Sequence, residues 1–202
     1  SHVMSPAAVG GWRGGIGLEN GLQWINLLYM FCNKIISVEN CIKFVIIKPS
    51  EGGFMYFLDL NGSDSEIADS FKALYAGAFP KEERKPLAIL WLLKKLGRIA
   101  TLALSHEDEF AGFVILGKTK RFVFIDYLAI DPSMRGKGLG SAVLEKIQEK
   151  YPNQTIVLEV ETPIESEENY HQRIRRIDFY KRNGFRKTDL RVLNNDCDFT
   201  IL

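Results

Sequence analysis

Hydrophobic and polar positions follow two different periods along residues 54–202, and these periods predict the secondary structure. Apolar residues at helical spacing predict helices over residues 65–79, 82–96, 139–150 and 170–183. Short runs rich in apolar, β-branched and aromatic residues predict strands over residues 54–60, 99–105, 109–117, 122–130, 155–160, 185–190 and 198–202. Hairpins combined with strand-helix-strand units indicate one α/β domain with a mixed sheet.

Residues 1–54 do not continue this pattern. The stretch 22–47 is apolar without a clear period, and Ser50-Glu51-Gly52-Gly53 then breaks the chain. We therefore expect an N-terminal extension at 1–54 and a domain at 55–202. Two interpretations of the extension stay open. One is an untranslated leader or artefact before a native start at Met55, because codons for Glu51-Gly52-Gly53 can resemble a ribosome-binding site. The other is a genuine arm that packs on the domain or on a second subunit through Trp24, Leu27, Leu28 and Phe31.

Composition limits the classes of function. Hydrophobic residues make up 46% and charged residues 25% of the chain. These proportions are those of ordinary globular proteins. A formal net charge of +1 gives no overall attraction to nucleic acid or to an anionic membrane. No apolar segment reaches the roughly 20 residues that a bilayer requires. Three cysteines without a CxxC pair, and three scattered histidines, predict no metal site and a cytoplasmic location.

The strongest chemical feature is a glycine-rich loop between the strand at 122–130 and the helix at 139–150. Its sequence is Arg135-Gly136-Lys137-Gly138-Leu139-Gly140. Glycines let backbone amides approach a ligand closely, and a helix N-terminus adds partial positive charge. The loop therefore predicts a phosphate or pyrophosphate site, although a tight strand-to-helix turn explains the glycines equally simply. It matches neither GxxxxGK[ST] nor GxGxxG.

This loop resembles the [QR]xxGx[GA] signature of the GNAT superfamily of acetyl-CoA-dependent N-acyltransferases. Downstream, Phe179-Tyr180-Lys181-Arg182-Asn183-Gly184-Phe185 resembles the second landmark of that family, a tyrosine separated by three residues from Gly-Phe. The resemblance covers about 55–202. It implies an α/β fold with a GNAT-type mixed β-sheet, helices on both faces, and the acyl-CoA wedged between two splayed parallel strands, at 122–130 and 155–160.

The resemblance implies acetyl-CoA as cosubstrate, with its pyrophosphate on the loop amides and its pantetheine arm along the preceding strand. The residues expected to bind it are Leu128, Ala129, Ile130, Arg135, Gly136, Lys137, Gly138, Leu139, Gly140 and Ser141. Many family members carry Asn and Ala where this chain has Arg173 and Arg176. Either these arginines bind a CoA phosphate, or they belong to a solvated helix face.

The resemblance also implies an N-acetyltransferase in which a primary amine attacks the thioester directly. Tyr180 occupies the position of the family's general acid toward the CoA sulfur, and an ordinary tyrosine is protonated at neutral pH. The general base is expected among three carboxylates, with Glu159 favoured over Glu161 and Asp126. The alternative for all four residues is a packing or ion-paired role.

The segment 80–86 forms a wall of the acceptor pocket in this family. Its substrate-binding candidates are Glu82, Glu83 and Arg84, and the two glutamates are suited to a cationic amine. We expect a small-molecule amine rather than a protein as acceptor, no nucleic-acid or membrane partner, and a homodimer as the assembly that fits the family. The alternatives are a CoA-binding module without turnover and an acetyltransferase for protein lysine or N-termini.

Overall fold

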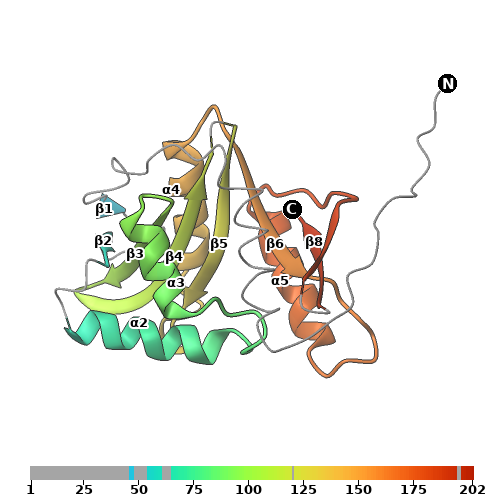
Figure 1. Cartoon of the computed structure of the whole chain (residues 1–202), viewed down its shortest axis with the longest axis horizontal. Coiled ribbons are helices and arrows are strands. Elements are labelled where there is room, and N and C mark those ends of the chain that lie inside the picture. Colours follow the sequence, from blue (N-terminus) through green and yellow to red (C-terminus); the bar gives the residue numbers. More distant parts are fainter. Residues whose placement is uncertain (1–45, 48–53, 61–64, 120, 195–196) are drawn as a thin grey trace, which may run out of the picture.

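The computed structural model describes residues 46–47, 54–60, 65–119, 121–194 and 197–202. Its elements are β1 (Ile46–Ile47), β2 (Met55–Asp59), α2 (Ser65–Ala78), α3 (Leu87–Lys95), β3 (Ile99–His106), β4 (Glu109–Lys118), β5 (Phe122–Ile130), a 3₁₀ turn (Pro132–Met134), α4 (Leu139–Lys150), β6 (Thr155–Glu161), α5 (Tyr170–Arg182), β7 (Arg191–Asn194) and β8 (Cys197–Ile201). These strands form one mixed sheet in the order β1-β2-β3-β4-β5-β6-β8-β7 (Figure 1).

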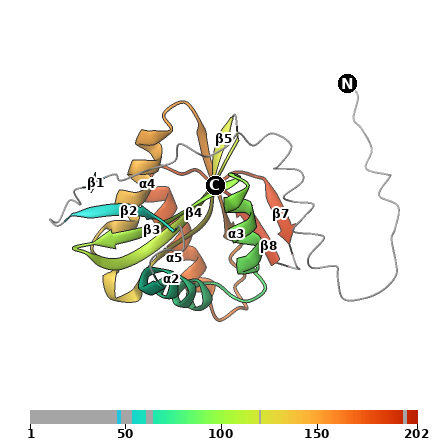
Figure 2. The same ribbon diagram turned by 60° about the vertical axis from the view of Figure 1, so that its left-hand side comes forward.

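Helices cover both faces of the sheet, as predicted. α2 and α3 lie on one face, and α4 and α5 lie on the other (Figures 1 and 2). Each pair of helices closes its own apolar cluster: Phe71 and Leu90 pack with Phe113, while Leu139 and Ile177 belong to the cluster on the opposite face. Every residue of β3 is buried, because both faces of this strand are covered.

β5 and β6 separate partway along their length, which confirms the predicted pair of splayed parallel strands. Phe122 to Ile125 pair in parallel with Thr155 to Leu158. Beyond these residues β5 stays paired with β4 as far as Ile130, whereas β6 pairs from Glu159 onward with β8. The change of partner opens the sheet on the β6 side of the last residues of β5.

The second helix begins at Leu87 rather than at residue 82. Pro86 stands at its N-cap with extended backbone angles, φ -53° and ψ 134°. A proline also disfavours helical conformation in the residue before it. The preceding segment forms a turn in which Glu83 N donates to Pro80 O at 3.1 Å. The candidate residues at 82–84 therefore lie on a connection and not on a helix.

The strand predicted at 185–190 is wrong. Thr188 Oγ1 donates to Ile201 O at 2.9 Å and accepts from Leu190 N at 3.2 Å. These bonds bend the backbone, and the strand forms later, as β7. At the other end, Ile46 and Ile47 pair with β2 although they belong to the predicted extension. Residues 1–45 and 48–53 lie outside the described residues, so the domain boundary at 55 stays a prediction.

Gly112 tests the register of β4 against β5 directly. Its φ is +152°, and a Cβ atom there would stand 2.3 Å from Ala129 O. We expect Gly112→Ala to lower the free energy of unfolding by more than about 1 kcal/mol in urea denaturation. Gly77→Ala is the control, since a Cβ at this exposed helical position meets no atom within 4 Å. It is expected to stabilise by about 0.5–1 kcal/mol. Equal stability of Gly112→Ala and wild type would contradict the register.

Candidate active site

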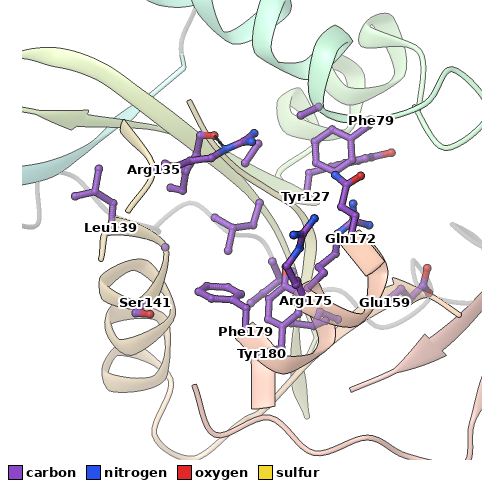
Figure 3. Close-up of a pocket in the computed structure, with 18 of the residues that line it drawn as sticks. Phe79, Tyr127, Arg135, Leu139, Ser141, Glu159, Gln172, Arg175, Phe179 and Tyr180 are labelled. Carbon is purple, nitrogen blue, oxygen red and sulfur yellow. Dashed lines mark hydrogen bonds between the residues drawn. The ribbon is translucent and has the colours of Figure 1, made fainter. Parts of the chain in front are cut away.

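A cavity of about 670 Å³ occupies the opening between β5 and β6. The glycine-rich loop, the end of β5, the start of α4 and one face of α5 surround it (Figure 3). The predicted site residues that line it are Glu83, Asp126, Leu128, Ala129, Ile130, Arg135, Gly136, Gly138, Leu139, Gly140, Ser141, Glu159, Glu161, Arg176 and Tyr180. The predicted residues that do not line it are Glu82, Arg84, Lys137 and Arg173.

The loop is shaped by conformations that favour glycine. Asp131 begins it by accepting hydrogen bonds from Ser133 N at 2.9 Å and Ser133 Oγ at 2.6 Å. Gly136 has a φ of 82°, and Gly138, the N-cap of α4, has a φ of 73°. Glycine adopts such positive angles without steric cost. Gly140 serves packing instead, because a Cβ there would come within 3.1 Å of the Phe179 ring. The first amides of α4, which lack intrahelical acceptors, thus stand beside the cavity.

Three exposed arginines line the mouth of the cavity. Arg135 lies on the loop, and its Nε donates to Ile130 O at 3.2 Å. Arg175 and Arg182 lie on α5, seven residues apart and therefore on one helix face. None of the three forms an ion pair with a carboxylate among the residues that the structure describes. Sequence reasoning missed Arg175 and Arg182, although their helical spacing with Phe179 was a usable signal.

Glu161 is held in a buried ion cluster. Its two oxygens lie 2.9 Å from Arg173 Nη2 and 2.9 Å from Arg176 Nη1, and its side chain is 7% exposed. Arg173 also donates to Thr162 O at 2.9 Å and pairs with Glu167. Arg173 is therefore engaged by this cluster and does not line the cavity, so its position gives no support to a CoA-phosphate role.

Asp126 is paired as well. Lys85 Nζ lies 2.6 Å from Asp126 Oδ1, and the two side chains are only 13% and 12% exposed. The ammonium group also lies 5.0 Å from the centroid of the Tyr127 ring. Asp126 is thus engaged by a cation in this structure, and Lys85 is a site residue that sequence reasoning did not identify.

Glu159 has no such ion pair within the described part of the chain. Burial raises the pKa of its carboxyl to about 7, the Asp126 charge adds to the rise, and the Lys85 charge opposes it. Burial likewise raises the pKa of Tyr180 to about 12, so its hydroxyl stays protonated. The cavity therefore contains a group able to accept a proton near neutral pH and a second group able to donate one.

The 80–86 connection is fixed over the cavity by two tyrosines. Tyr127 OH donates to Glu83 O at 2.9 Å and accepts from Lys85 N at 3.1 Å. Tyr75 OH donates to Lys85 O at 3.0 Å. Burial raises the pKa of Glu83 to about 7, and the charge and hydrogen bond of Glu161 add to this rise. Glu83 therefore titrates near neutral pH at the inner wall of the cavity.

The described residues contain no group of three or more His, Cys, Asp or Glu side chains that could hold a metal ion. Among the same residues, no helix combines the length and the apolar character needed to cross a bilayer.

Residues 97–187 match the family model described as Acetyltransferase (GNAT) domain. A Bacillus subtilis (strain 168) protein described as "Putative acetyltransferase YjbC" is 34% identical over 110 residues, which cover 54% of this chain and 52% of that protein. The chain thus spans about half the length of this curated relative.

Solved structures share the fold. A Bacteroides thetaiotaomicron structure described as "Putative acetyltransferase from GNAT family" has a TM-score of 0.59 and 26% identity, covering 72% of this chain and 85% of that one. Arabidopsis thaliana Naa50, in complex with the bisubstrate analogue CoA-Ac-MVNAL, has a TM-score of 0.53 and 21% identity, covering 73% and 97%. The second likeness concerns the fold alone. Together with the loop and the splayed strands, the family model, the Bacillus relative and the Bacteroides structure support assignment of this chain to the GNAT superfamily.

Proposed function

We propose that this chain is an N-acetyltransferase that moves an acetyl group from acetyl-CoA to a primary amine by direct attack. One observation carries the proposal: a single cavity at the β5–β6 opening is lined by the glycine-rich loop, by Glu159 and by Tyr180. A phosphate-binding end and a proton-transfer end therefore belong to one site.

The residues present fit coenzyme A. The amides at the start of α4 suit the pyrophosphate, and Arg135, Arg175 and Arg182 suit the remaining phosphate charge. Beyond Ile125, β5 has no partner among the described strands on the side of β6, so backbone groups of Leu128 and Ile130 are placed to pair with the amides of the pantetheine arm. Bound there, acetyl-CoA supplies an activated acyl group at the inner end of the cavity.

The inner residues supply the proton transfers. Glu159, directly or through water, takes a proton from the acceptor ammonium, and the free amine attacks the thioester carbonyl carbon. The new C–N bond forms as the C–S bond breaks, and Tyr180 donates its phenolic proton to the leaving sulfur. The attacking nitrogen then loses its second proton, which returns Tyr180 to the phenol and leaves a neutral amide. A base with a pKa of about 7 combines a useful ionised fraction with useful basicity at neutral pH.

We infer a small amine rather than a protein as acceptor, because the 80–86 connection is held by Tyr127 across the inner wall. Release of the CoA thiol, measured over a panel of small amines and of peptides with free N-termini or lysines, tests this. Turnover of peptides alone would favour a protein acceptor, and no turnover at all would favour a binding module. The cytoplasmic location and the homodimer stay predictions.

Gly138→Asp tests the cofactor end. It places a side chain and a negative charge at the N-cap of α4, where the pyrophosphate is expected. We expect calorimetry to show loss of coenzyme A binding in a folded protein. Gly184→Asp is the matched control, since Gly184 also has positive φ (+88°), does not line the cavity, and a Cβ there would meet only Gln148 Nε2, at an ordinary contact distance of 3.8 Å. Unchanged affinity of Gly138→Asp would show that coenzyme A binds elsewhere.

Tyr180→Phe tests the leaving-group step. We expect nearly unchanged coenzyme A affinity and a kcat lowered by about tenfold to a thousandfold, because the thiolate would leave without its proton donor. Steady-state kinetics over a range of pH measure both quantities. A kcat equal to wild type at every pH would remove Tyr180 from the mechanism.

The raised pKa of Glu159 predicts the acidic limb of the kcat/KM profile against pH. The base is active when ionised, so kcat/KM rises as pH increases through about 7. Glu159→Gln removes this limb and lowers the rate by about 10²–10⁴-fold. Lys85→Met removes a charge that lowers the pKa of Glu159, so the midpoint moves up. Asp126→Asn removes a charge that raises this pKa, so the midpoint moves down. If neither Lys85→Met nor Asp126→Asn shifts the midpoint of the pH profile, Glu159 is excluded as the base.

A further inference from the structure

Four carboxyl side chains line the cavity, and only two of them form ion pairs with cations of the protein. Asp126 has Lys85 at 2.6 Å, and Glu161 has two guanidinium groups at 2.9 Å. Among the described residues, Glu159 and Glu83 have no cation within ion-pair distance. A half-buried carboxylate without a neutralising cation is costly, so a cationic ligand bound beside it would be stabilising. Glu159 has a role as the general base, whereas the direct attack of one amine gives none to Glu83.

Glu83 completes the charge of the neighbouring ion cluster. The Glu161 carboxyl raises the pKa of Glu83 and is itself held in place by Arg173 and Arg176, and Glu167 pairs with Arg173 in the same cluster. With Glu83 protonated, the remaining two carboxylates balance two guanidinium groups. When Glu83 ionises, one negative charge is in excess at the cavity wall. A cation bound beside Glu83 would restore neutrality in exchange for the proton.

The position of Glu83 is fixed before any ligand arrives. Tyr127 OH holds the Glu83 carbonyl at 2.9 Å, and Tyr127 packs edge-on against Tyr75 and Phe79, with ring centroids 5.1 and 4.9 Å apart. Such preorganisation reduces the entropy cost of binding. The rings of Phe79 and Tyr127 also line the cavity, and aromatic faces attract cations.

We propose that the acceptor carries two cationic nitrogens, and that Glu83 holds the non-reacting ammonium while Glu159 deprotonates the reacting one. The inference rests on the proposed function and narrows its acceptor to diamines. The second ammonium keeps its charge throughout, and Glu83 loses its proton to solvent on binding. The acyl transfer is otherwise unchanged: one C–N bond forms, one C–S bond breaks, and the sulfur receives its proton from Tyr180.

Matched acceptors test this inference. In thiol-release assays with acetyl-CoA, 1,4-diaminobutane is compared with 4-amino-1-butanol, and the comparison is repeated with the longer diamines and amino alcohols. We expect kcat/KM to favour the diamine of the best length by about tenfold to a hundredfold, mainly through KM. Glu83→Gln should bring this ratio close to one. Glu145→Gln, on an exposed position of α4 away from the cavity, should leave the ratio unchanged.

A second variant and a second measurement distinguish a loss of charge recognition from a loss of folding. Glu83→Asp keeps the negative charge on a shorter side chain. This variant should still prefer diamines over amino alcohols, but its preferred diamine should be longer than that of the wild type. Calorimetry of 1,4-diaminobutane binding to the protein saturated with coenzyme A, in buffers of different ionisation enthalpy at neutral pH, should show proton release that Glu83→Gln reduces.

The outcomes separate the two proposals. Equal kcat/KM for diamines and amino alcohols in the wild type would overturn the inference and leave the acetyltransferase proposal intact. Absence of thiol release with every amine would overturn the acetyltransferase proposal, while diamine binding weakened by Glu83→Gln would still support the role of Glu83. If Glu83→Gln changes neither the affinity for the diamine nor the number of protons released on binding, the inference is overturned.

Discussion

The site depends on one change of hydrogen-bonding partner in the sheet. β6 pairs with β5 up to Leu158 and with β8 from Glu159 onward. Backbone hydrogen bonds must be satisfied somewhere, so β8 compensates β6 for the partner that it loses. β5 has no such replacement on that side among the described strands, and the cavity forms beside it. The same step carries Glu159 to the edge of the opening, where its carboxyl is largely buried and no described residue forms an ion pair with it.

Charge is divided along this cavity. Arginines that pair with no carboxylate in the described part of the chain stand at the mouth, and carboxyl groups stand inside, where Asp126 and Glu161 are bound to cations of the protein itself. A ligand with phosphate groups at one end and a cationic partner at the other is complementary to this division. The two charges of the Lys85–Asp126 pair act on the pKa of Glu159 with opposite sign, because Asp126 raises this pKa and Lys85 lowers it.

Local signals explain what could be predicted from the sequence. The loop follows from glycines at alternate positions between a strand and a helix, and the position of Tyr180 follows from the short segment around it. Contacts between distant segments could not be read this way: Lys85 meets Asp126 across 41 residues, and Arg173 turns to Glu161. The start of α3 was missed although Pro86 was a local signal, because the apolar period was extended through it.

The claim that coenzyme A occupies the β5–β6 opening is tested most directly by amide chemical shifts in ¹⁵N-labelled protein. The structure offers a second cavity of about 240 Å³, lined by residues that include Phe57, Leu102 and Lys146, as an internal comparison. Titration with coenzyme A should shift the amides of Gly136, Gly138 and the end of β5, and leave those around the second cavity unchanged. Shifts centred on the second cavity, with the loop amides unmoved, would contradict the account.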